Sequence, residues 1–398
     1  MPNDTASPFT PGVPVPVEFF FGRSNEIQRL RGKADKAATG ALQVAFMVGE
    51  RGIGKSSLAT FVRVLAERQP GLLGVHTFLG GVGSLEEMVR RVFDRLLKES
   101  VEKAWFDRVK AFLGNRVREV GLFGITVEFE AAGQDLARLV HDFAPALRQL
   151  AKQLEGQKKG ILLILDDING LASSPEFANW LKSLVDEIAT SQTPMPLFLL
   201  LVGLEERRQA LIRSQASLAR VFDLIEIHPW SDVEAREFFH NAFRTANMSL
   251  DADAAELMVR YSGGLPVLAH EIGDAVYKVA SGEKVTRNHA LTGIVEASEI
   301  VGRKYLEPQV FLAIKSPKYR SILKHVGTDH FPFEFRRAEL LQRLHGDEKG
   351  ALDNFLHRMT ELGVIVREPA KGPGSYRFSN DLHYLYICFS VGAYEREK

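Results

Sequence analysis

Short apolar runs alternate with stretches of helical spacing over the first 230 residues. Runs without polar positions have the length of strands and are typical of strands buried on both faces of a sheet. The segments between them repeat apolar residues every three or four positions, as amphipathic helices do. This alternation predicts an α/β fold with a parallel sheet. The strand-like runs are ALQVAFMV, GVHTFLGGVG, ILLILDD and LFLLLVG, and the helical segments are KSSLATFVRVLAERQ, LEEMVRRVFDRLLKES and residues 175 to about 190.

A different pattern follows residue 230, where helical spacing replaces the apolar runs. SDVEAREFFHNAFRTAN opens with a Ser-x-x-Glu capping box, and the next stretch gives two helices broken at Gly263-Gly264-Leu265-Pro266. From about Tyr305, three more helical segments precede GVIVREPAKGPGSYRFSN, which has the pattern of two short strands around a turn. Three helices followed by a hairpin is the element order of a winged helix.

These patterns predict four parts of the chain. The opening segment is rich in Pro and Thr and is expected to be a flexible lead-in, and Ser24 is expected to cap the first helix of the core. An insertion in the core contains a β-like stretch, VGLFGITVEFE, and is expected to pack against the core rather than to bind a partner. The predicted parts are residues 1–17, the lead-in; 18–230, the α/β core with the insertion at about 101–157; 231–300, a helical lid; and 301–398, a winged-helix domain.

The composition is that of a water-soluble globular protein, with 45% hydrophobic and 25% charged residues. Fifty basic side chains balance fifty acidic ones, so no overall charge attracts nucleic acid or an anionic membrane. Cys388 is the only cysteine, which excludes an internal disulfide and a cysteine-rich metal site. The apolar runs fall short of the ~18 residues of a membrane span, and the N-terminal prolines do not fit a signal peptide. We therefore expect a cytoplasmic protein with no membrane contact.

The strongest motif lies between the first strand-like run and the helix that follows it. Its sequence, GERGIGKS from Gly49 to Ser56, is a full match to G-x-x-x-x-G-K-[ST]. The glycines let backbone N–H groups converge on phosphate oxygens, and the start of the helix adds partial positive charge. Lys55 is expected to reach the β and γ phosphates of ATP, and the Ser56 hydroxyl to bind Mg²⁺. The predicted phosphate-binding residues are Gly49, Glu50, Arg51, Gly52, Ile53, Gly54, Lys55, Ser56 and Ser57.

A second motif ends the run ILLILDD, where an apolar strand delivers two carboxylates. Asp166 is expected to bind Mg²⁺ directly or through water, because oxygen ligands suit this cation. Asp167 follows where hydrolytic relatives often carry Glu, and is our candidate to orient or activate the attacking water. Strand ends with two aspartates are common in surface positions, so it is the P-loop upstream that favours the catalytic interpretation.

FFGRSNEIQRL, the P-loop, ILLILDD and GGLPVLAHE together resemble the P-loop ATPases of the AAA+ and STAND group. In that group a Gly-Arg-x-x-Glu segment lies near adenine, which here implies Gly22, Arg23 and Glu26. The Gly-x-Pro motif of the STAND lid packs near the nucleotide, which implies a role for Pro266. LARVFDLIEIHPWSDVEAREFF is similar to the join between core and lid in initiator-type and transposition-regulator ATPases. The resemblance covers about residues 18 to 290.

Two positions depart from the AAA+ pattern. A polar sensor residue is expected at the end of the fourth core strand, yet LFLLLVGLEE offers Gly203 and then only acidic polar residues. A sensor arginine is expected in the lid, where this chain has Leu265-Pro266-Val267, and this favours the STAND-like interpretation.

Arg220 is placed to act as an arginine finger on the γ-phosphate, in the same or a neighbouring subunit. An ordinary arginine at a helix end is the alternative.

The C-terminal segment resembles the winged-helix domain that ends several initiator-type and archaeal-type ATPases. Residues 301–398 carry sixteen basic and twelve acidic side chains, a net charge of about +4 that is mild for a DNA-binding module. Winged helices also contact proteins, so both kinds of partner stay open. KGALDNFLHRMTELG is the expected recognition helix, with Lys349, His357 and Arg358 facing outward, and Lys371 and Arg377 are expected in the wing.

The sequence thus predicts an ATP- and Mg²⁺-dependent switch, an ATPase that is slow without a partner or an oligomer. One hypothesis is a DNA-associated factor of initiator or transposition-regulator type, which contacts double-stranded DNA through the winged helix. The alternative is a STAND-type signalling or defence switch whose winged helix and insertion contact proteins. A third hypothesis is nucleotide binding without turnover.

Overall fold

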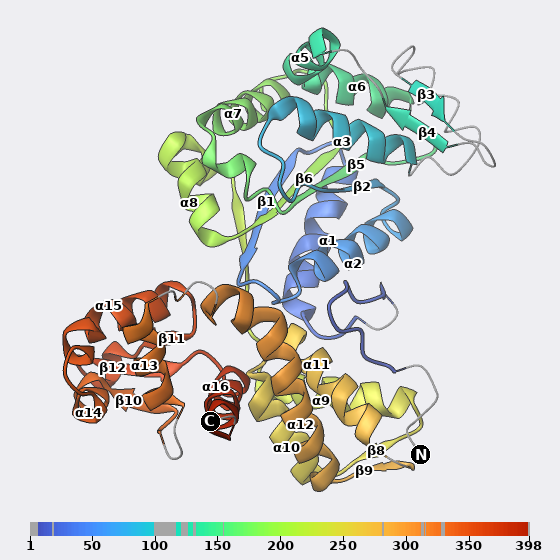
Figure 1. The fold of residues 1–398 in the computed structure, drawn as a ribbon. Helices are drawn as coiled ribbons and strands as arrows, with labels where there is room; N and C mark the ends of the chain where they lie inside the picture. The colour runs from blue at the N-terminus through green and yellow to red at the C-terminus, as the bar shows by residue number, and fades with distance from the viewer. Residues whose placement is uncertain are drawn as a thin grey trace. The chain divides into compact units, whose positions relative to one another are not determined.

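The computed structural model describes residues 7–17, 20–98, 117–120, 126–129, 133–153, 155–280, 282–311, 314, 316–327 and 331–396 (Figure 1). The chain separates into two compact units. One comprises Pro14–His228, and the other comprises Met1–Val13 together with Pro229–Lys398. Among the described residues, no helix combines the length and apolar character needed to cross a membrane.

A five-stranded parallel sheet forms the centre of the first unit, with the strand order β2-β5-β6-β1-β7 (Figure 1). The predicted α/β class with a parallel P-loop-type sheet is therefore confirmed. Every residue of β5 and β6 is buried, which explains why both are apolar apart from Asp166 at the end of β5. The strands are β1 (Gln43–Gly49), β2 (Leu73–Phe78), β5 (Ile161–Asp166), β6 (Leu197–Gly203) and β7 (Asp223–Ile227).

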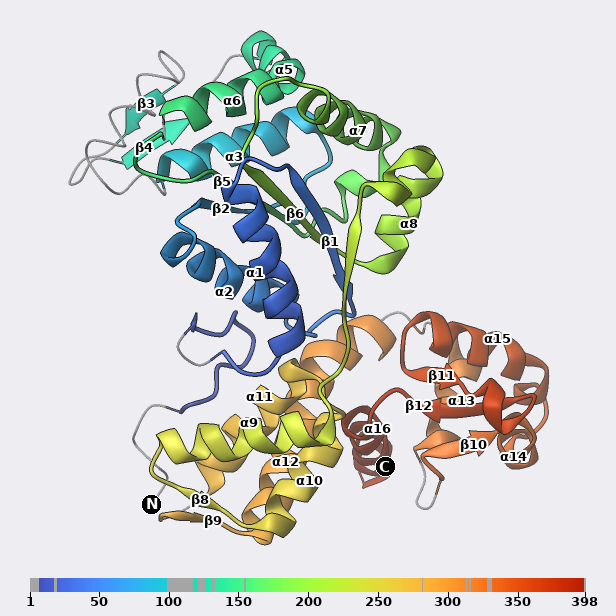
Figure 2. The same ribbon diagram turned by 180° about the vertical axis from the view of Figure 1, so that it is seen from behind.

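Helices cover both faces of this sheet (Figure 2). Val44, Phe46 and Val48 of β1 point to the face where the buried side chains of α3, α5, α6, α7 and α8 complete one hydrophobic core. Helices α1 and α2 contact the sheet on the other side and pack on each other. The helices are α1 (Ser24–Ala38), α2 (Lys55–Arg68), α3 (Leu85–Lys98), α5 (Gly133–His141), α6 (Phe143–Gln153), α7 (Pro175–Ala189) and α8 (Glu205–Ser214).

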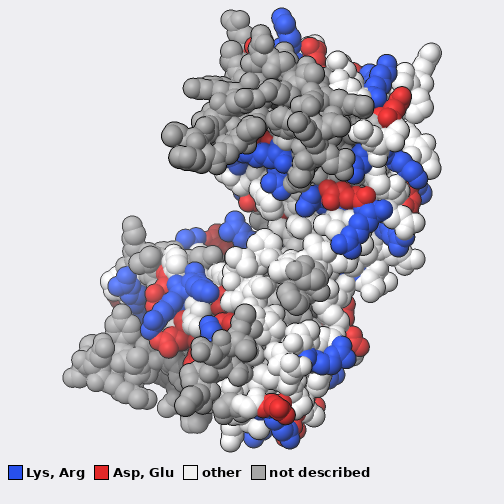
Figure 3. Space-filling model, turned by 90° about the vertical axis from the view of Figure 1, so that its right-hand side faces the viewer, with Lys and Arg blue, Asp and Glu red and all other residues white. Residues whose placement is uncertain are grey.

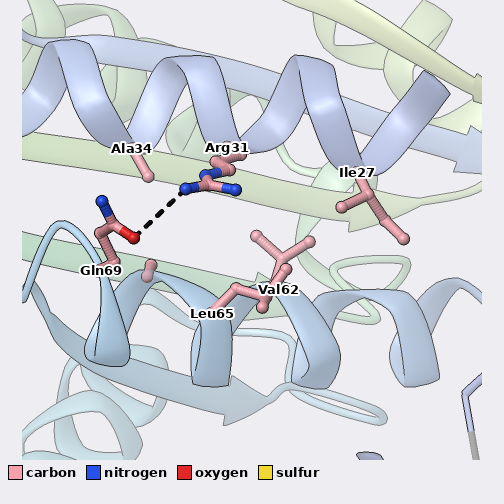
Figure 4. Close-up of a pocket in the computed structure, with 7 residues that line it drawn as sticks. Ile27, Arg31, Ala34, Val62, Leu65 and Gln69 are labelled. Atoms are coloured by element: carbon pink, nitrogen blue, oxygen red, sulfur yellow. Dashed lines mark hydrogen bonds between the residues drawn. The ribbon is translucent and has the colours of Figure 1, made fainter. Parts of the chain in front are cut away.

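Between α1 and α2 lies a small, mostly apolar crevice, which Figure 4 shows in close-up. At one end of it, Arg31 Nη2 donates a hydrogen bond to Gln69 Oε1 at 3.3 Å. The crevice is lined by Ile27, Arg31, Ala34, Val62, Leu65, Ala66 and Gln69.

Two local expectations for the core need correction or completion. The expected cap of α1 is wrong: Ser24 is the first helical residue, and the N-cap is Arg23, which has a left-handed backbone (φ 65°). The β-like stretch of the insertion is confirmed, because β4 (Thr126–Phe129) pairs antiparallel with β3 (Val117–Val120). Residues 101–116, the first part of the insertion, lie outside the described residues.

The second unit begins with a helical bundle of α9 (Asp232–Thr245), α10 (Ala252–Ser262), α11 (Pro266–Val279) and α12 (Arg287–Val301). The capping box of α9 is present, with Ser231 and Glu234 each bonded to the other's backbone N–H. The break between α10 and α11 depends on Gly264, whose φ is 70° and where a Cβ would lie 2.2 Å from the carbonyl oxygen of Trp230.

Part of the expected flexible lead-in is packed in this bundle. Phe9 is only 3% exposed, and its ring lies 5.9 Å from that of Phe238 and 5.1 Å from that of Phe243. A Cβ at Gly273 would lie 2.2 Å from the Phe9 ring, so this glycine makes room for it. Flexibility is therefore the wrong expectation for the residues around Phe9.

The remainder of the second unit has a hydrophobic core of its own, separate from the core of the sheet. Four helices and three short strands surround this core, and the strands pair antiparallel in the order β10-β12-β11. The elements are α13 (Pro317–Val326), β10 (Glu334–Arg336), α14 (Arg337–Arg343), α15 (Glu348–Glu361), β11 (Ile365–Arg367), β12 (Ser375–Phe378) and α16 (Asp381–Arg396), after a π-helical segment at Gly302–Phe311.

Candidate functional site

The P-loop connects the end of β1 to the start of α2 at the carboxyl edge of the sheet. Gly52 (φ 76°) and Gly54 (φ 93°) have left-handed backbones that residues with a Cβ rarely adopt. Gly49 has an ordinary backbone, but a Cβ there would lie 2.8 Å from the carbonyl oxygen of Ile227 on β7. The glycines therefore allow both the turn and its close approach to the neighbouring strand.

Lys55 lies across this loop. Its Nζ donates to the carbonyl oxygens of Gly49 at 2.9 Å and Glu50 at 2.7 Å. Desolvation by burial lowers the pKa of Lys55, and the charges of Asp166 and Asp167 oppose this effect. The ammonium group is thus held at the loop, and the negative charges of Asp166 and Asp167 act to raise its pKa against the effect of burial.

The two serines after Lys55 have different surroundings. The side chain of Ser57 faces inward, where its Oγ accepts a hydrogen bond from the backbone N–H of Val15 at 3.2 Å. Ser56 is half-buried, and its carbonyl oxygen accepts from the hydroxyl of Thr60 at 2.9 Å. No hydrogen bond engages the Ser56 hydroxyl among the described residues, which leaves it available for a ligand.

Arg23 is buried and fastens the P-loop to the segment after β7. Its guanidinium donates from Nη2 to the carbonyl oxygen of Ile53 at 3.2 Å and from Nη1 to the carbonyl oxygen of His228. The preceding Gly22 has a φ of 76°. The structure therefore brings Arg23 to the P-loop, and its role near adenine stays a prediction.

Asp166 is the last residue of β5 and is 2% exposed. Its Oδ2 lies 3.0 Å from Nε2 of His76 on the neighbouring strand β2. The other carboxylate oxygen, Oδ1, accepts no hydrogen bond from the described residues. Asp166 therefore has one oxygen engaged by the protein and one available to a ligand.

Asp167 leaves the strand with a left-handed backbone (φ 56°) and an exposed side chain. Its carboxylate lies against the loop after β2, because a Cβ at Gly80 would be 2.9 Å from Asp167 Oδ2. The side-chain amide of Asn169 donates to Asp167 Oδ1, and its oxygen accepts from the backbone N–H of Leu204 at 3.3 Å. Asn169 therefore links Asp167 to the end of β6, where the sequence offers no polar sensor residue.

The sequence interpretation missed three residues of this region, His76, Thr60 and Asn169. His76 and Thr77 are the polar residues of a mostly apolar strand, and this was the one signal available for His76. Asn169 follows directly on the aspartate pair, and Thr60 lies four residues after Ser56 on α2. Their contacts depend on which strands are neighbours, and a linear pattern does not give that information.

Two predicted site residues are not brought to the P-loop by any described contact. Arg220 ends the 3₁₀ helix Ala216–Arg220, is exposed, and makes no hydrogen bond or ion pair with the residues that the structure describes. Pro266 is the first residue of α11, in the second unit. The roles of both residues stay predictions.

Comparison with known protein families assigns the part of the chain that contains these residues to a domain family. Residues 20–202, which include the P-loop, Asp166 and Asp167, match the family model described as the AAA ATPase domain. The chain carries a P-loop AAA+ ATPase domain. This domain is of the nucleotide-binding, ATP-hydrolysing type, so these parts of the sequence prediction are confirmed.

Similar solved structures share the fold over nearly the full length of the chain. A Walker-type ATPase of Pyrococcus abyssi is 16% identical, with 93% of this chain and 96% of that chain covered and a TM-score of 0.57. The ORC2 protein of Aeropyrum pernix, in its ADPNP–ADP complexes, is 14% identical, with 94% and 95% covered and a TM-score of 0.58. The ADP form of that ORC2 protein covers 98% of this chain and 97% of its own, with a TM-score of 0.50 and 14% identity. No curated protein matches the sequence.

Proposed function

We propose that this protein is a magnesium-dependent ATPase switch whose P-loop binds the phosphates of ATP. The observation that carries the proposal is the placement of Lys55, whose Nζ is held across the glycine loop at the sheet edge where β5 delivers Asp166 and Asp167. On binding, phosphate oxygens would replace the carbonyl oxygens of Gly49 and Glu50 as its partners. A cation facing two carboxylates at one sheet edge suits a ligand with both phosphate and a divalent metal.

The chemistry of the available oxygens fits Mg²⁺. Among the described residues, no group of three or more His, Cys, Asp or Glu side chains could hold a metal ion. Mg²⁺ is usually held by one or two protein oxygens together with phosphates and waters. Asp166 Oδ1 and the Ser56 hydroxyl would supply those protein oxygens. The ion neutralises charge on the phosphates when it is bound.

Asp167 would orient the attacking water. Its exposed carboxylate is turned away from the strand and held by Asn169. A fixed carboxylate lowers the entropic cost of placing the water in line with the γ-phosphate. Arg220 would supply positive charge to the γ-phosphate, in the same or a neighbouring chain, and turnover would be slow while it is not in place.

The helical bundle α9–α12 would act as a lid that moves when bound ATP is hydrolysed. Pro266 lies at the start of α11 next to the Gly263-Gly264 break, and the resemblance implies that it contacts nucleotide. A ligand shifts a two-state equilibrium only if it binds one state more tightly. Contact of Pro266 with ATP would provide that difference for the bundle α9–α12.

The C-terminal elements would form a winged helix that contacts a partner. Their order along the chain, α13, β10, α14, α15, β11 and β12, supports this proposal. Most cations expected to face DNA are paired: Lys371 with Glu334 at 2.5 Å, Arg377 with Glu368 at 2.5 Å, and Arg358 with Glu361 at 3.1 Å. Figure 3 shows the right-hand side of the view in Figure 1, where basic and acidic side chains of the described residues lie interspersed rather than in a patch of one sign.

This charge pairing favours the second candidate function, a STAND-type switch with a protein partner, over DNA contact. Lys349 is exposed and makes no ion pair among the described residues. If DNA is the partner, duplex binding in the presence of ATP would weaken with salt, and Lys349→Ala would flatten that salt dependence. No duplex binding at low salt with ATP present would discard the DNA function and leave the protein partner.

The ATPase proposal is tested by measuring nucleotide binding and phosphate release for the wild type, Lys55→Ala and Asp167→Ala. We expect Lys55→Ala to weaken ATP binding, because it removes the ammonium group that meets the phosphates. Asp167→Ala should retain binding and lose most of the phosphate release. Equal phosphate release from all three proteins would discard turnover and leave nucleotide binding alone.

A further inference from the structure

A buried histidine contacts Asp166, one of the two proposed protein ligands of Mg²⁺. His76 is on β2, the strand next to β5, and is 2% exposed. Its ring stacks on Phe78 with the centroids 4.4 Å apart and an interplanar angle of 26°. Packing therefore fixes the plane of the imidazole, so that its two nitrogens point in set directions.

The imidazole connects the two proposed protein ligands of Mg²⁺. On one side, Nε2 lies 3.0 Å from Asp166 Oδ2. On the other side, Nδ1 lies 3.3 Å from Thr60 Oγ1, and this hydroxyl donates to the carbonyl oxygen of Ser56 at 2.9 Å. A row of polar contacts thus joins the end of β5 to the first turn of α2. Because the Asp166 carboxylate only accepts, the neutral ring donates from Nε2, and Nδ1 is then an acceptor that shares the single Thr60 hydroxyl proton with the carbonyl oxygen of Ser56.

We propose that His76 and Thr60 are positioning residues that fix the geometry of the magnesium site. The inference rests on the proposed function, and it assigns residues outside the P-loop and the aspartate pair to the same site. With Oδ2 held by His76, the Asp166 carboxylate presents Oδ1 to the metal in one orientation. Residues that hold metal-binding carboxylates and histidines by hydrogen bonds typically change metal affinity or activity by about 10–100-fold when removed.

The test compares His76→Leu, which removes both ring nitrogens, with His76→Gln, whose amide can supply a donor near the position of Nε2. Binding of a fluorescent ATP analogue is titrated with Mg²⁺, and binding of Mn²⁺ in the presence of nucleotide is followed by electron paramagnetic resonance. We expect His76→Leu to raise the half-saturating metal concentration about 10–100-fold. Nucleotide affinity in EDTA should stay within about twofold of wild type, and His76→Gln should recover most of the metal affinity.

Substitutions of Thr60 on α2 provide an independent test, because they leave the sequence of the buried strand β2 unchanged. Thr60→Val removes the hydroxyl at nearly constant volume and should weaken metal binding in the same direction, whereas the matched Thr60→Ser should not. If folded His76→Leu and Thr60→Val both show wild-type metal dependence, the inference is overturned. If His76→Leu does not fold, the Thr60 pair and His76→Gln decide. A wild type that binds no nucleotide with Mg²⁺ would instead refute the proposed function itself.

Discussion

The side-chain amide of Asn169 donates a hydrogen bond to the carboxylate of Asp167, and its oxygen accepts one from the backbone N–H of Leu204. Asp167 is exposed and has a left-handed backbone, and the contact links its carboxylate to the end of the neighbouring strand β6. AAA+ relatives are expected to carry a polar sensor residue at that strand end, and here Gly203 occupies it. Asn169 supplies a polar group to the same place from the loop after β5.

Replacement of Asn169 by Ala should slow ATP hydrolysis with little change in nucleotide affinity. Asp167 loses the donor that orients it, and a misplaced general base or water-positioning group costs about 10²-fold. Steady-state phosphate release should show a lower kcat, while titration with a fluorescent nucleotide should not change. Asn25→Ala, at an exposed position on α1, is the control. An unchanged kcat would assign Asn169 to loop structure only.

Gly49→Ala should damage the P-loop, because the added Cβ would lie 2.8 Å from the carbonyl oxygen of Ile227 and 3.0 Å from Ile53 Cγ2. Relief of such a contact requires a backbone shift, which typically costs about 1–3 kcal/mol. Urea unfolding should show that loss, and ATP binding should weaken together with it. Gly83→Ala is the matched control, since nothing lies within 4 Å of a Cβ at that position. Equal stability of both variants would contradict the close approach of β1 and β7.

Arg220→Ala should lower kcat if this residue completes the site, because an arginine finger contributes about 10³–10⁵-fold. Arg213→Ala, another exposed arginine nearby in sequence, is the control. Mixing Arg220→Ala with Lys55→Ala distinguishes the two arrangements. Recovery of phosphate release in the mixture indicates that the arginine acts on a neighbouring chain, and no recovery indicates action within one chain. Wild-type activity of Arg220→Ala would make it an ordinary surface residue.

Acid should destabilise the second unit through His270. Burial lowers the pKa of His270 to about 4, and its Nδ1 accepts a hydrogen bond from the backbone N–H of Thr10 at 3.1 Å. The unfolded pKa of about 6.5 lies above the folded one, so the stabilising contribution is complete above pH 6.5. It is lost as the pH falls from 6.5 toward 4, by up to about 3 kcal/mol.

Unfolding experiments between pH 6.5 and 4 measure the slope of the free energy of unfolding against pH. His270→Gln should flatten it, whereas replacement of the exposed His240 by Gln should not. Part of the slope should remain in His270→Gln, since burial also lowers the pKa of His383 to about 4. A slope identical to wild type in His270→Gln would show that the imidazole is not buried in solution.

The main strands and the P-loop could be predicted because their signals are local. Strands β5 and β6 are buried on both faces and are therefore apolar apart from Asp166 at the end of β5, and the glycine spacing of the P-loop reflects its backbone directly. Strand β7 was missed because it lies at the edge of the sheet and mixes Asp223 and Glu226 with apolar residues. Its sequence has too little apolar character for a buried run.

The rest of the site depends on relationships between distant segments. His76 reaches Asp166 because β2 and β5 are neighbours whose register pairs Phe78 with Asp166. Phe9 is buried because Gly273, far along the chain, leaves space for its ring. Neither relationship has a periodic signal, since each is set by tertiary packing rather than by the local preference of the chain.

The burial of Phe9 determines which of the two units a label at the N-terminus would monitor. Residues up to Val13 belong to the helical unit, whereas Val15 already bonds to Ser57 beside the P-loop, so the polypeptide passes between the units twice. A fluorophore or affinity tag placed ahead of Ser7 would therefore monitor the helical unit, although the nucleotide loop is much nearer along the chain. A truncation that removes Phe9 would likewise take a buried ring out of the helical unit.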